Sequence, residues 1–287
     1  MAVGDLSLQG KIVVVTGGGS GMHLAFSKLA HAEGAKVIIA DLRLGPESEN
    51  LSPEIVFQST DVRKWSDLRN LVEVSKEKFG DVPDVYVAGA GVFEPDWSNF
   101  WDDTEDQRYA AVDINVNHPI KLTRIAIRAL REKNKKGVVL IMSSIAGYSR
   151  LFGAPMYATT KHALVGFARS MKELDELVGI KVVAMCPGIV NTPLWKSRSD
   201  AETRWGYKDD IAISAEDVAK AEIKLIKEGE YGGGTIYEIS LFGERVVLEW
   251  NIDPPGHDRL GEMRGAEIPK EAMEAAYKPI MDALNSR

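Results

Sequence analysis

Short apolar runs rich in Val and Ile alternate along the chain with longer stretches whose apolar residues recur at helical spacing. The runs that predict strands are residues 11–16, 36–41, 55–58, 85–88, 137–142, 181–185 and 234–239. The stretches that predict helices are residues 24–33, 65–79, 104–133 and 157–174. Because parallel strands need crossover helices between them, the alternation predicts an α/β fold: a doubly wound, mostly parallel sheet of about seven strands with helices on both faces.

The alternation is continuous from residue 10 to residue 240, without a linker, a repeat or a low-complexity tract. We therefore expect residues 1–287 to form a single domain. Residues 244–287 depart from the pattern and are expected to form a C-terminal extension, with a loop at 250–256 and a helix at 270–284. The helix predicted at 104–133 is too long to be unbroken unless it lies across an interface.

Charge and composition argue against several classes of protein. The net charge of −7 is spread along the chain, and no basic cluster suits a nucleic-acid backbone. The longest apolar runs have the length of strands, so we expect no membrane segment, and residues 1–5 show no secretory signal. Cys186 is the lone cysteine, and no His, Cys or carboxylate group has metal-ligand spacing, so we expect neither a disulfide nor a metal site. These features favour a cytoplasmic protein.

A glycine-rich turn, Thr-Gly-Gly-Gly-Ser-Gly-Met-His, joins the first predicted strand to the first predicted helix at residues 16–23. Glycines let the backbone approach a pyrophosphate closely, and the N-terminus of a helix favours its negative charge. The turn therefore predicts a dinucleotide site. Its candidate contacts are Thr16, Gly17, Ser20, Gly21 and Met22.

Asp41 ends the second predicted strand, 24 residues after Gly17. A carboxylate there can accept hydrogen bonds from the ribose hydroxyls and would repel a 2′-phosphate, which favours NAD over NADP. Arg43 lies two residues further on, and a guanidinium at that place can bind the same phosphate. NADP is therefore not excluded.

Tyr157 and Lys161 are four residues apart in a predicted helix and so share one face of it. A phenol is a poor acid–base catalyst at neutral pH, but a nearby ammonium favours the phenolate, so we expect Lys161 to lower the pKa of Tyr157. Ser144 follows the strand predicted at 137–142, at the sheet edge where ligands bind in open α/β folds. The Ser144 hydroxyl is a candidate to hold the substrate oxygen beside the phenol.

In this order along the chain, the motifs resemble those of the short-chain dehydrogenase/reductase family, from residue 8 to about residue 240. The matching residues are Thr16, Gly17 and Gly21 in the cofactor turn, Asp61 and Val62 at the adenine, Asn115 in the helix before the fifth strand, Ser144, Tyr157 and Lys161 at the catalytic centre, and Pro187, Gly188, Val190 and Thr192 in a loop beside the nicotinamide. More narrowly, residues 161–167 and 234–239 are similar to the 15-hydroxyprostaglandin dehydrogenase-like branch, which does not imply a prostaglandin substrate.

The resemblance implies a Rossmann fold and an NAD(P)-dependent oxidoreductase that moves a hydride between a nicotinamide and a secondary alcohol or ketone. Tyr157 would exchange the proton with the substrate oxygen, and Lys161 would lower its pKa and bind the ribose. Ser144 would polarise the carbonyl, and Asn115 would complete a proton relay. The family also implies a homodimer or homotetramer, built through the helices predicted at 104–133 and 157–174.

Two departures from the family pattern affect the nucleotide end. His23 replaces the last glycine of the cofactor turn, and Ala88-Gly89-Ala90-Gly91 replaces Asn-Asn-Ala-Gly after the fourth strand. We expect these changes to affect cofactor affinity more than chemistry, because the small residues leave room for the cofactor and Gly89 is a candidate contact to it. Because asparagines in that motif tie neighbouring strands, some backbone groups must find other partners here.

The segment at residues 193–213 occupies the position of the family's substrate lid, and its two tryptophans suit a bulky, apolar alcohol or ketone. The aromatic, acidic segment at 97–103 is either pocket wall or structural loop. Two other functions stay open: a dinucleotide-binding sensor without redox activity, and a cyclase or lyase in which the cofactor shapes the site. The intact Ser144, Tyr157 and Lys161 favour the oxidoreductase over both.

Overall fold

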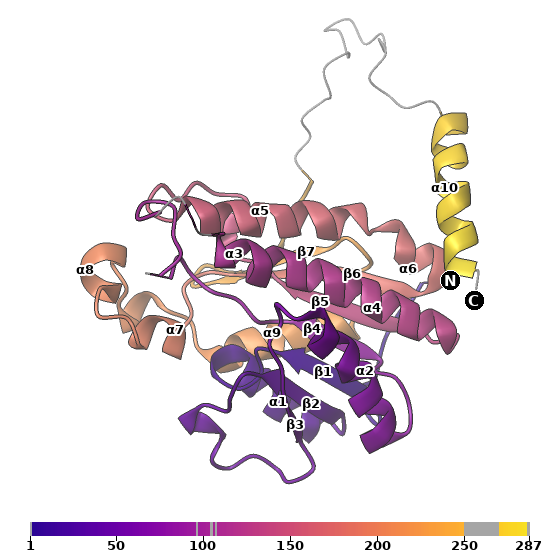
Figure 1. Ribbon diagram of the computed structural model, residues 1–287, viewed down its shortest axis with the longest axis horizontal. Coiled ribbons are helices and arrows are strands. Elements are labelled where there is room, and N and C mark those ends of the chain that lie inside the picture. Colours follow the sequence, from indigo (N-terminus) through magenta and orange to yellow (C-terminus); the bar gives the residue numbers. More distant parts are fainter. Residues whose placement is uncertain (1, 96, 104–105, 107, 250–269, 286–287) are drawn as a thin grey trace, which may run out of the picture. The chain divides into compact units, whose positions relative to one another are not determined.

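The computed structural model describes residues 2–95, 97–103, 106, 108–249 and 270–285 (Figure 1). Its contacts divide the chain into two compact units, Met1–Val247 and Leu248–Arg287. The first unit contains the sheet and every site residue predicted above. In the second unit the structure describes one helix, α10 (Lys270–Asn285), in agreement with the helix expected at 270–284. The loop expected at 250–256 lies outside the described residues.

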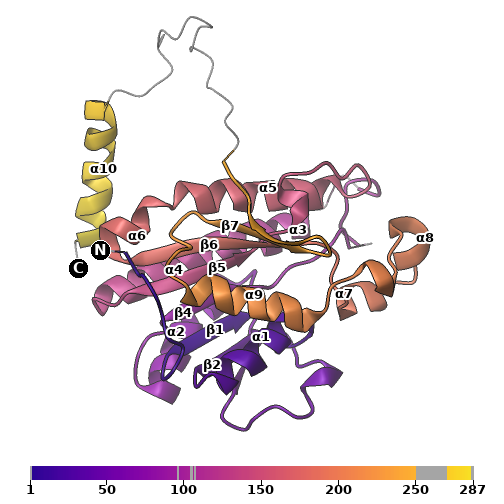
Figure 2. The same cartoon turned by 180° about the vertical axis from the view of Figure 1, so that it is seen from behind.

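A single sheet forms the centre of the first unit (Figures 1 and 2). Its strands are β1 (Ile12–Thr16), β2 (Lys36–Asp41), β3 (Val56–Ser59), β4 (Val85–Ala88), β5 (Gly137–Met142), β6 (Ile180–Pro187), β7 (Ile236–Ser240) and β8 (Gly243–Val246). They are arranged in the order β3-β2-β1-β4-β5-β6-β7-β8. All neighbouring pairs up to β7 are parallel, and the pair β7–β8 is antiparallel. The doubly wound, mostly parallel sheet is therefore confirmed.

The sheet has one strand more than expected. β8 follows β7 through a short hairpin and is exposed along its whole length, so it carries no apolar run that would predict a strand. It also lies within the first unit, so that unit extends three residues past residue 244, where the sequence pattern changes.

Helices cover both faces of the sheet (Figures 1 and 2). On one face lie α2 (Trp65–Phe79), α4 (His118–Glu132) and α5 (Pro155–Ser170), and on the other α1 (Gly21–Ala32) packs against α9 (Ala215–Lys227). The sequence pattern missed α9, whose N-terminus is capped by the Ser214 hydroxyl, which accepts a hydrogen bond from the Asp217 backbone N–H. The shorter helices are α6 (Glu173–Val178), α7 (Pro193–Lys196) and α8 (Ala201–Trp205), with 3₁₀ turns η1 (Pro46–Ser48), η3 (Ile145–Gly147) and η4 (Asp209–Ile211).

The helix expected at 104–133 is divided. Its helical part begins with α3 (Ala110–Val112), passes through a π-helical turn, η2 (Asp113–Asn117), and continues as α4. The π turn holds Asn115, and such turns are frequent at functional sites. The helix expected at 157–174 is likewise two elements, α5 and α6, which part after Ser170.

The burial and the order of the strands determine where a ligand site can form. Strands β1, β4, β5 and β6 are buried along their whole length because helices cover both faces, which is why they read as unbroken apolar runs. Since these strands are parallel, their carboxyl ends meet at one edge of the sheet. The order of the strands reverses between β1 and β4, which is where open α/β sheets bind their ligands.

Candidate active site

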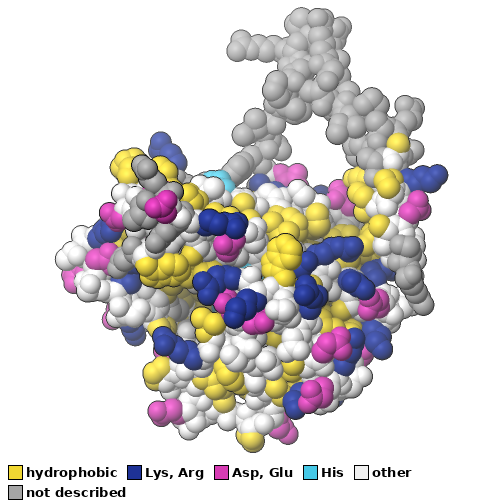
Figure 3. Space-filling model, in the orientation of Figure 1, with side chains coloured by type: hydrophobic (Ala, Val, Ile, Leu, Met, Phe, Trp, Pro, Cys, Tyr) yellow, Lys and Arg dark blue, Asp and Glu magenta, His cyan; other side chains and the backbone are white. Residues whose placement is uncertain are grey.

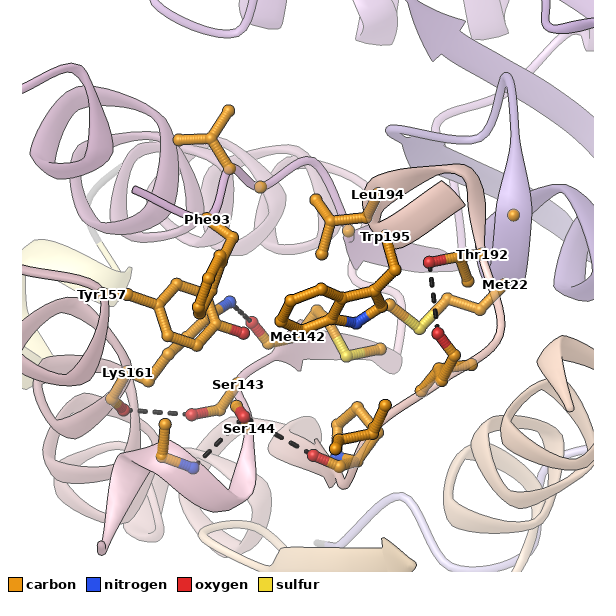
Figure 4. Close-up of a pocket in the computed structure, with 18 of the residues that line it drawn as sticks. Met22, Phe93, Met142, Ser143, Ser144, Tyr157, Lys161, Thr192, Leu194 and Trp195 are labelled. Atoms are coloured by element: carbon orange, nitrogen blue, oxygen red, sulfur yellow. Dashed lines mark hydrogen bonds between the residues drawn. The ribbon is translucent and has the colours of Figure 1, made fainter. Parts of the chain in front are cut away.

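A cavity of about 490 Å³ opens at this edge of the sheet (Figure 4). Most of the predicted site residues line it: Gly17, Ser20, Gly21, Met22, Asp41, Gly89, Ser144, Tyr157, Lys161, Pro187, Gly188, Val190 and Thr192. Four predicted residues do not: Thr16, Asp61, Val62 and Asn115. One continuous space therefore reaches from the glycine turn to the Ser144, Tyr157 and Lys161 side chains.

The glycine turn is packed too tightly for side chains. Gly17 has φ +70°, and a Cβ there would lie 2.7 Å from the Ala90 Cα atom. Gly21 has φ +56°, and its Cβ would lie 3.2 Å from the Thr192 methyl carbon. Ser20, the residue before α1, makes no side-chain capping hydrogen bond. The turn thus presents the bare backbone and the N-terminus of α1 to the cavity, an arrangement suited to a phosphate.

Asp41 holds the glycine turn against the end of β2. Its Oδ2 atom accepts a hydrogen bond from the Gly19 N–H at 2.9 Å, and its Oδ1 atom accepts one from the Leu42 N–H at 2.7 Å. A carboxylate has about four acceptor positions, so both oxygens can still receive ribose hydroxyls. Arg43 is exposed and does not line the cavity.

His23 turns inward at the first turn of α1 and is buried. Its Nε2 atom lies 3.2 Å from the Glu222 Oε1 atom on α9, and the Glu222 side chain is fully buried. The imidazole also fills the space next to Gly89: a Cβ at that position would lie 2.5 Å from the His23 Cε1 atom. The two departures from the family pattern are therefore in contact with each other.

Thr16 ties β1 to β4 where the family uses asparagine. Its hydroxyl oxygen accepts a hydrogen bond from the Gly89 N–H at 3.0 Å and lies 3.0 Å from the His118 Nε2 atom. Burial lowers the pKa of His118 to about 4, so its imidazole is neutral at neutral pH. With its Nδ1–H donated to the Ile114 carbonyl, its Nε2 atom can accept the Thr16 hydroxyl proton. Thr16 is thus a structural tie behind the cavity wall.

Ser144, Tyr157 and Lys161 lie together at the other end of the cavity (Figure 4). The Ser144 hydroxyl caps η3 by accepting the Ala146 N–H at 3.2 Å, and it donates to the Pro187 carbonyl oxygen at 3.5 Å. The Lys161 ammonium donates to the Met142 carbonyl oxygen at 2.8 Å and lies 5.4 Å from the centre of the Tyr157 ring.

The pKa values of this pair do not follow the expectation that Lys161 lowers the pKa of Tyr157. Burial raises the pKa of Tyr157 to about 12, and the nearby Ser144 hydroxyl offsets this only in part. Burial also lowers the pKa of Lys161 to about 8. The physical reason is that both groups are buried and that the ammonium is directed at the Met142 carbonyl. In this arrangement Tyr157 holds its proton at neutral pH.

Asn115 lies behind Lys161, outside the cavity wall. Its side-chain amide pairs with both backbone polar groups of Val92 at 2.9 Å and donates to the Thr160 hydroxyl at 3.1 Å. A Cβ on Gly91 would lie 3.4 Å from the Asn115 Oδ1 atom and 3.8 Å from the Lys161 Nζ atom. Asn115 therefore joins the segment that follows β4 to the helix that carries Lys161.

Asp61 and Val62, which were expected to contact the adenine, make other contacts in the structure. Asp61 forms an ion pair with Arg63 at 2.8 Å, which holds the pKa of this carboxyl below its usual range. Val62 is buried in the core beside α2. Neither lines the cavity.

The sequence reasoning missed part of the cavity wall. Phe93, Met142, Ile145 and Leu151 line it and had not been singled out. Leu194, Trp195 and Trp205 line it too, and they belong to the segment at 193–213 that the sequence had indicated. The Phe93 ring contacts the Tyr157 ring with a centroid distance of 4.7 Å. The feature of the sequence that could have identified Phe93 is its position two residues after the Ala-Gly-Ala-Gly motif.

The aromatic segment at 97–103 does not contribute to the cavity within the described residues. Trp97 and Phe100 are exposed, and Trp101 contacts the Phe152 ring and donates its indole N–H to the Phe152 carbonyl. The segment is therefore a loop with exposed aromatic side chains, in which Ser98 and Asn99 are buried.

Other kinds of site are not indicated by the described part of the chain. Within it, no group of His, Cys, Asp or Glu side chains could hold a metal ion. None of the helices there is long and apolar enough to cross a membrane. On the face shown in Figure 3, basic and acidic side chains are interspersed, without a large basic patch.

Comparison with known proteins agrees with the residues found in the cavity, because the matching proteins are dehydrogenases and reductases. The short chain dehydrogenase family model matches residues 11–203. The short-chain dehydrogenase/reductase ascJ of Acremonium egyptiacum is 38% identical over 245 residues, which cover 79% of this chain and 82% of that protein. The NAD(+) 15-hydroxyprostaglandin dehydrogenase of Mus musculus is 28% identical over 272 residues, covering 87% and 97%.

A third relative matches less of its length. The short-chain dehydrogenase/reductase prx4 of Penicillium rubens is 32% identical over 194 residues, and the match spans 65% of this chain but 56% of that protein. The family model, by contrast, includes the glycine turn, Asn115, Ser144, Tyr157 and Lys161 within its matched range. The chain belongs to the short-chain dehydrogenase family.

Proposed function

We propose that the protein is an NAD(P)-dependent oxidoreductase that interconverts a secondary alcohol and a ketone. The observation that carries this proposal is the single cavity that contains both the glycine turn and the Ser144, Tyr157 and Lys161 side chains. A nucleotide held by the turn and a substrate oxygen held by the three side chains would share that space. The fold alone would not support an activity, because many activities use it.

The cavity suits a nicotinamide dinucleotide. Gly17 and Gly21 keep the backbone bare where a Cβ would meet neighbouring atoms, and Asp41 lies at the same end. Asp41 would hold the adenosine ribose and disfavour a 2′-phosphate, so we propose NAD in preference to NADP. Two similar proteins are named as NAD(+) enzymes, which supports the same choice. Pro187, Gly188, Val190 and Thr192 would hold the nicotinamide end.

The nicotinamide supplies or accepts the hydride, and the chain moves the proton. In the direction of ketone reduction, the Tyr157 hydroxyl donates its proton to the substrate oxygen, and in alcohol oxidation it takes that proton back. A protonated Tyr157, as burial favours, suits the reductive direction. The Ser144 hydroxyl orients the substrate oxygen, and the Lys161 cation stabilises the phenolate once it forms. Asn115 holds the helix segment beside Lys161 in place.

The substrate end of the cavity is apolar. Phe93, Leu151, Leu194, Trp195 and Trp205 surround the reactive groups. We propose an apolar alcohol or ketone enclosed by residues 193–213 as a lid. Relatives named for ipsdienol, 1-deoxy-11-beta-hydroxypentalenate and 15-hydroxyprostaglandin show that similar chains act on different alcohols.

We also propose that the protein is a homodimer or homotetramer assembled through α4 and α5. Ile120 on α4 is an exposed apolar residue on one of these helices. Light scattering that gave only the 31.5 kDa monomer would contradict this proposal.

Hydride transfer tests the proposed activity directly. The protein is incubated with a panel of apolar ketones and NADH or NADPH deuterated at nicotinamide C4, and the alcohol products are analysed by mass spectrometry. Deuterium on the carbinol carbon is the expected result. Ketones that remain unreduced with both dinucleotides, and alcohols that remain unoxidised in the reverse assay, would favour a dinucleotide-binding protein without redox activity.

A further inference from the structure

Glu94 is a buried acidic residue in the segment that follows β4, and the chemistry proposed above does not use it. Its exposed fraction is 5%, and its backbone lies in the left-handed region with φ +30°. This conformation is uncommon for a residue with a side chain and is strained. Surrounding contacts must therefore hold Glu94 in place.

The Glu94 side chain caps the helix that carries the catalytic residues. Its Oε1 atom accepts hydrogen bonds from the backbone N–H groups of Met156 at 2.8 Å and Tyr157 at 3.1 Å. These groups belong to the first turn of α5, where N–H groups have no partner within the helix. The residue that precedes α5, Ala154, has no side chain able to cap it. The cap comes instead from 62 residues away in sequence.

The backbone of the same segment is held from the opposite side by the proposed lid. The Arg198 Nη1 atom donates to the carbonyl oxygens of Phe93 at 3.2 Å and Glu94 at 3.4 Å. The Arg198 guanidinium is fixed by two hydrogen bonds of 2.9 Å to Asp200, which also accepts the Trp205 indole N–H at 3.2 Å. Residues 93 and 94 thus lie between the lid segment and the N-terminus of α5.

Phe93 makes the same connection through its ring. Its centroid lies 4.7 Å from that of Tyr157, 4.9 Å from that of Trp195 and 4.7 Å from that of Trp205. Figure 4 shows Phe93 beside Tyr157, with Trp195 extending into the same space. A shift of residues 93 and 94 would therefore displace both the lid tryptophans and the Tyr157 phenol.

We propose that Glu94 is a positioning residue that sets the place of the Tyr157 hydroxyl by capping α5, and that Arg198 couples this cap to the lid. The proposal rests on the proposed oxidoreductase activity for its kinetic consequence, but the cap itself is testable without it. Small displacements of a reacting group are costly: about 1 Å can reduce turnover by about a hundredfold. Glu94 touches neither substrate nor cofactor in this account and acts through the helix alone.

Three variants separate positioning from stability. Glu94→Ala removes the cap, whereas Glu94→Gln keeps a carbonyl oxygen that can accept the same two N–H groups. Ser214→Ala removes the hydroxyl cap of α9, which lies outside the site, and serves as the matched control for lost helix capping. All three are purified as full chains, and thermal stability, dinucleotide affinity, kcat and KM are measured.

We expect Glu94→Ala to lower kcat by about tenfold to a hundredfold, with dinucleotide affinity within about twofold of the parent. Glu94→Gln should recover most of kcat. Ser214→Ala should lower the thermal stability by an amount similar to Glu94→Ala, because each variant removes one helix cap, and it should leave kcat unchanged. A Glu94→Ala enzyme with parental kcat, or a Gln variant no better than Ala, would overturn the proposal.

The lid coupling is tested by adding Arg198→Ala. If Arg198 acts through the same segment, the loss of kcat in the Glu94→Ala/Arg198→Ala double variant is smaller than the product of the two single losses. Losses that multiply would show that the lid and the cap act independently and would remove Arg198 from the proposal.

Amide hydrogen exchange distinguishes failure of this inference from failure of the proposed activity. In Glu94→Ala the amides of Met156 and Tyr157 should exchange about tenfold faster or more, and in Glu94→Gln and Ser214→Ala they should stay protected. Protection that is lost as expected in a protein without hydride transfer would refute the activity and retain the cap. Unchanged protection in Glu94→Ala would refute the cap even if the enzyme is active.

Discussion

The imidazole of His23 occupies the space that a side chain at position 89 would need. A Cβ on Gly89 would lie 2.5 Å from the His23 Cε1 atom and 2.6 Å from the Nδ1 atom. The ring has no room to withdraw, because it is buried and its Nε2 atom lies 3.2 Å from the buried Glu222 carboxyl. His23 and Gly89, which depart separately from the family motifs, are thus one coupled change.

This contact predicts a non-additive response to substitution. Gly89→Ala should destabilise the protein by about 1–3 kcal/mol, because the added methyl overpacks the site. In a His23→Ala/Glu222→Leu background, which removes the ring and the buried carboxyl together, the same substitution should cost less than about 1 kcal/mol. Denaturant unfolding of the four proteins measures both values. Equal costs in the two backgrounds would show that the ring does not set the requirement for glycine.

Asp41 should govern the choice between the two dinucleotides. Asp41→Ala is expected to weaken NADH binding by about tenfold or more, because hydrogen bonds to a charged group are lost. NADPH binding should weaken less or improve, because the repulsion of a 2′-phosphate is removed. Asp41→Asn keeps the size of the side chain and removes the charge, so it should relax the preference with a smaller loss of NADH affinity. Titration by nicotinamide fluorescence checks these values, and an unchanged NADH to NADPH ratio in both variants would exclude Asp41 as the determinant.

His118 should make the protein sensitive to acid. The unfolded imidazole binds a proton below about pH 6.5, whereas the buried His118 stays neutral down to its pKa of about 4. Between these values the unfolded state binds more protons, so stability falls as the pH falls. The 2.5-unit interval corresponds to about 3 kcal/mol at most.

The measurement is the free energy of unfolding as a function of pH for the parent and for His118→Gln. The variant is expected to lose stability at neutral pH, because the bond to Thr16 is altered, but to show a shallower decline between about pH 6.5 and pH 4. Parallel curves for the two proteins would mean that another group causes the acid sensitivity.

Local patterns were enough to predict much of this fold. Strands β1, β4, β5 and β6 appear as buried apolar runs because parallel strands covered on both faces have few polar positions. Tyr157 and Lys161 could be paired from their spacing of four residues on one helix, and Ser144 from its place at the end of a strand. The lone missed strand among those described, β8, is short, exposed and polar.

Contacts between distant segments could not be predicted from the sequence. Nothing near Ala154 shows that Glu94 caps α5, and nothing near Gly89 shows that His23 fills the neighbouring space. The raised pKa of Tyr157 could not be predicted from the sequence either, because the spacing to Lys161 gives proximity but neither the burial of the phenol nor the bond from Lys161 to Met142. Such properties depend on how the whole core closes around a residue.

The central claim is that the Tyr157 hydroxyl moves the proton, and the most direct test compares two tyrosine variants. Tyr86 in β4 is a matched control: it is fully buried, and its hydroxyl has no hydrogen-bond partner among the described residues. Tyr86→Phe should keep parental kcat and be at least as stable. Tyr157→Phe should lower kcat by about a hundredfold to ten-thousandfold while dinucleotide affinity stays within about twofold. A Tyr157→Phe protein that reduces its ketone at the parental rate would contradict the account.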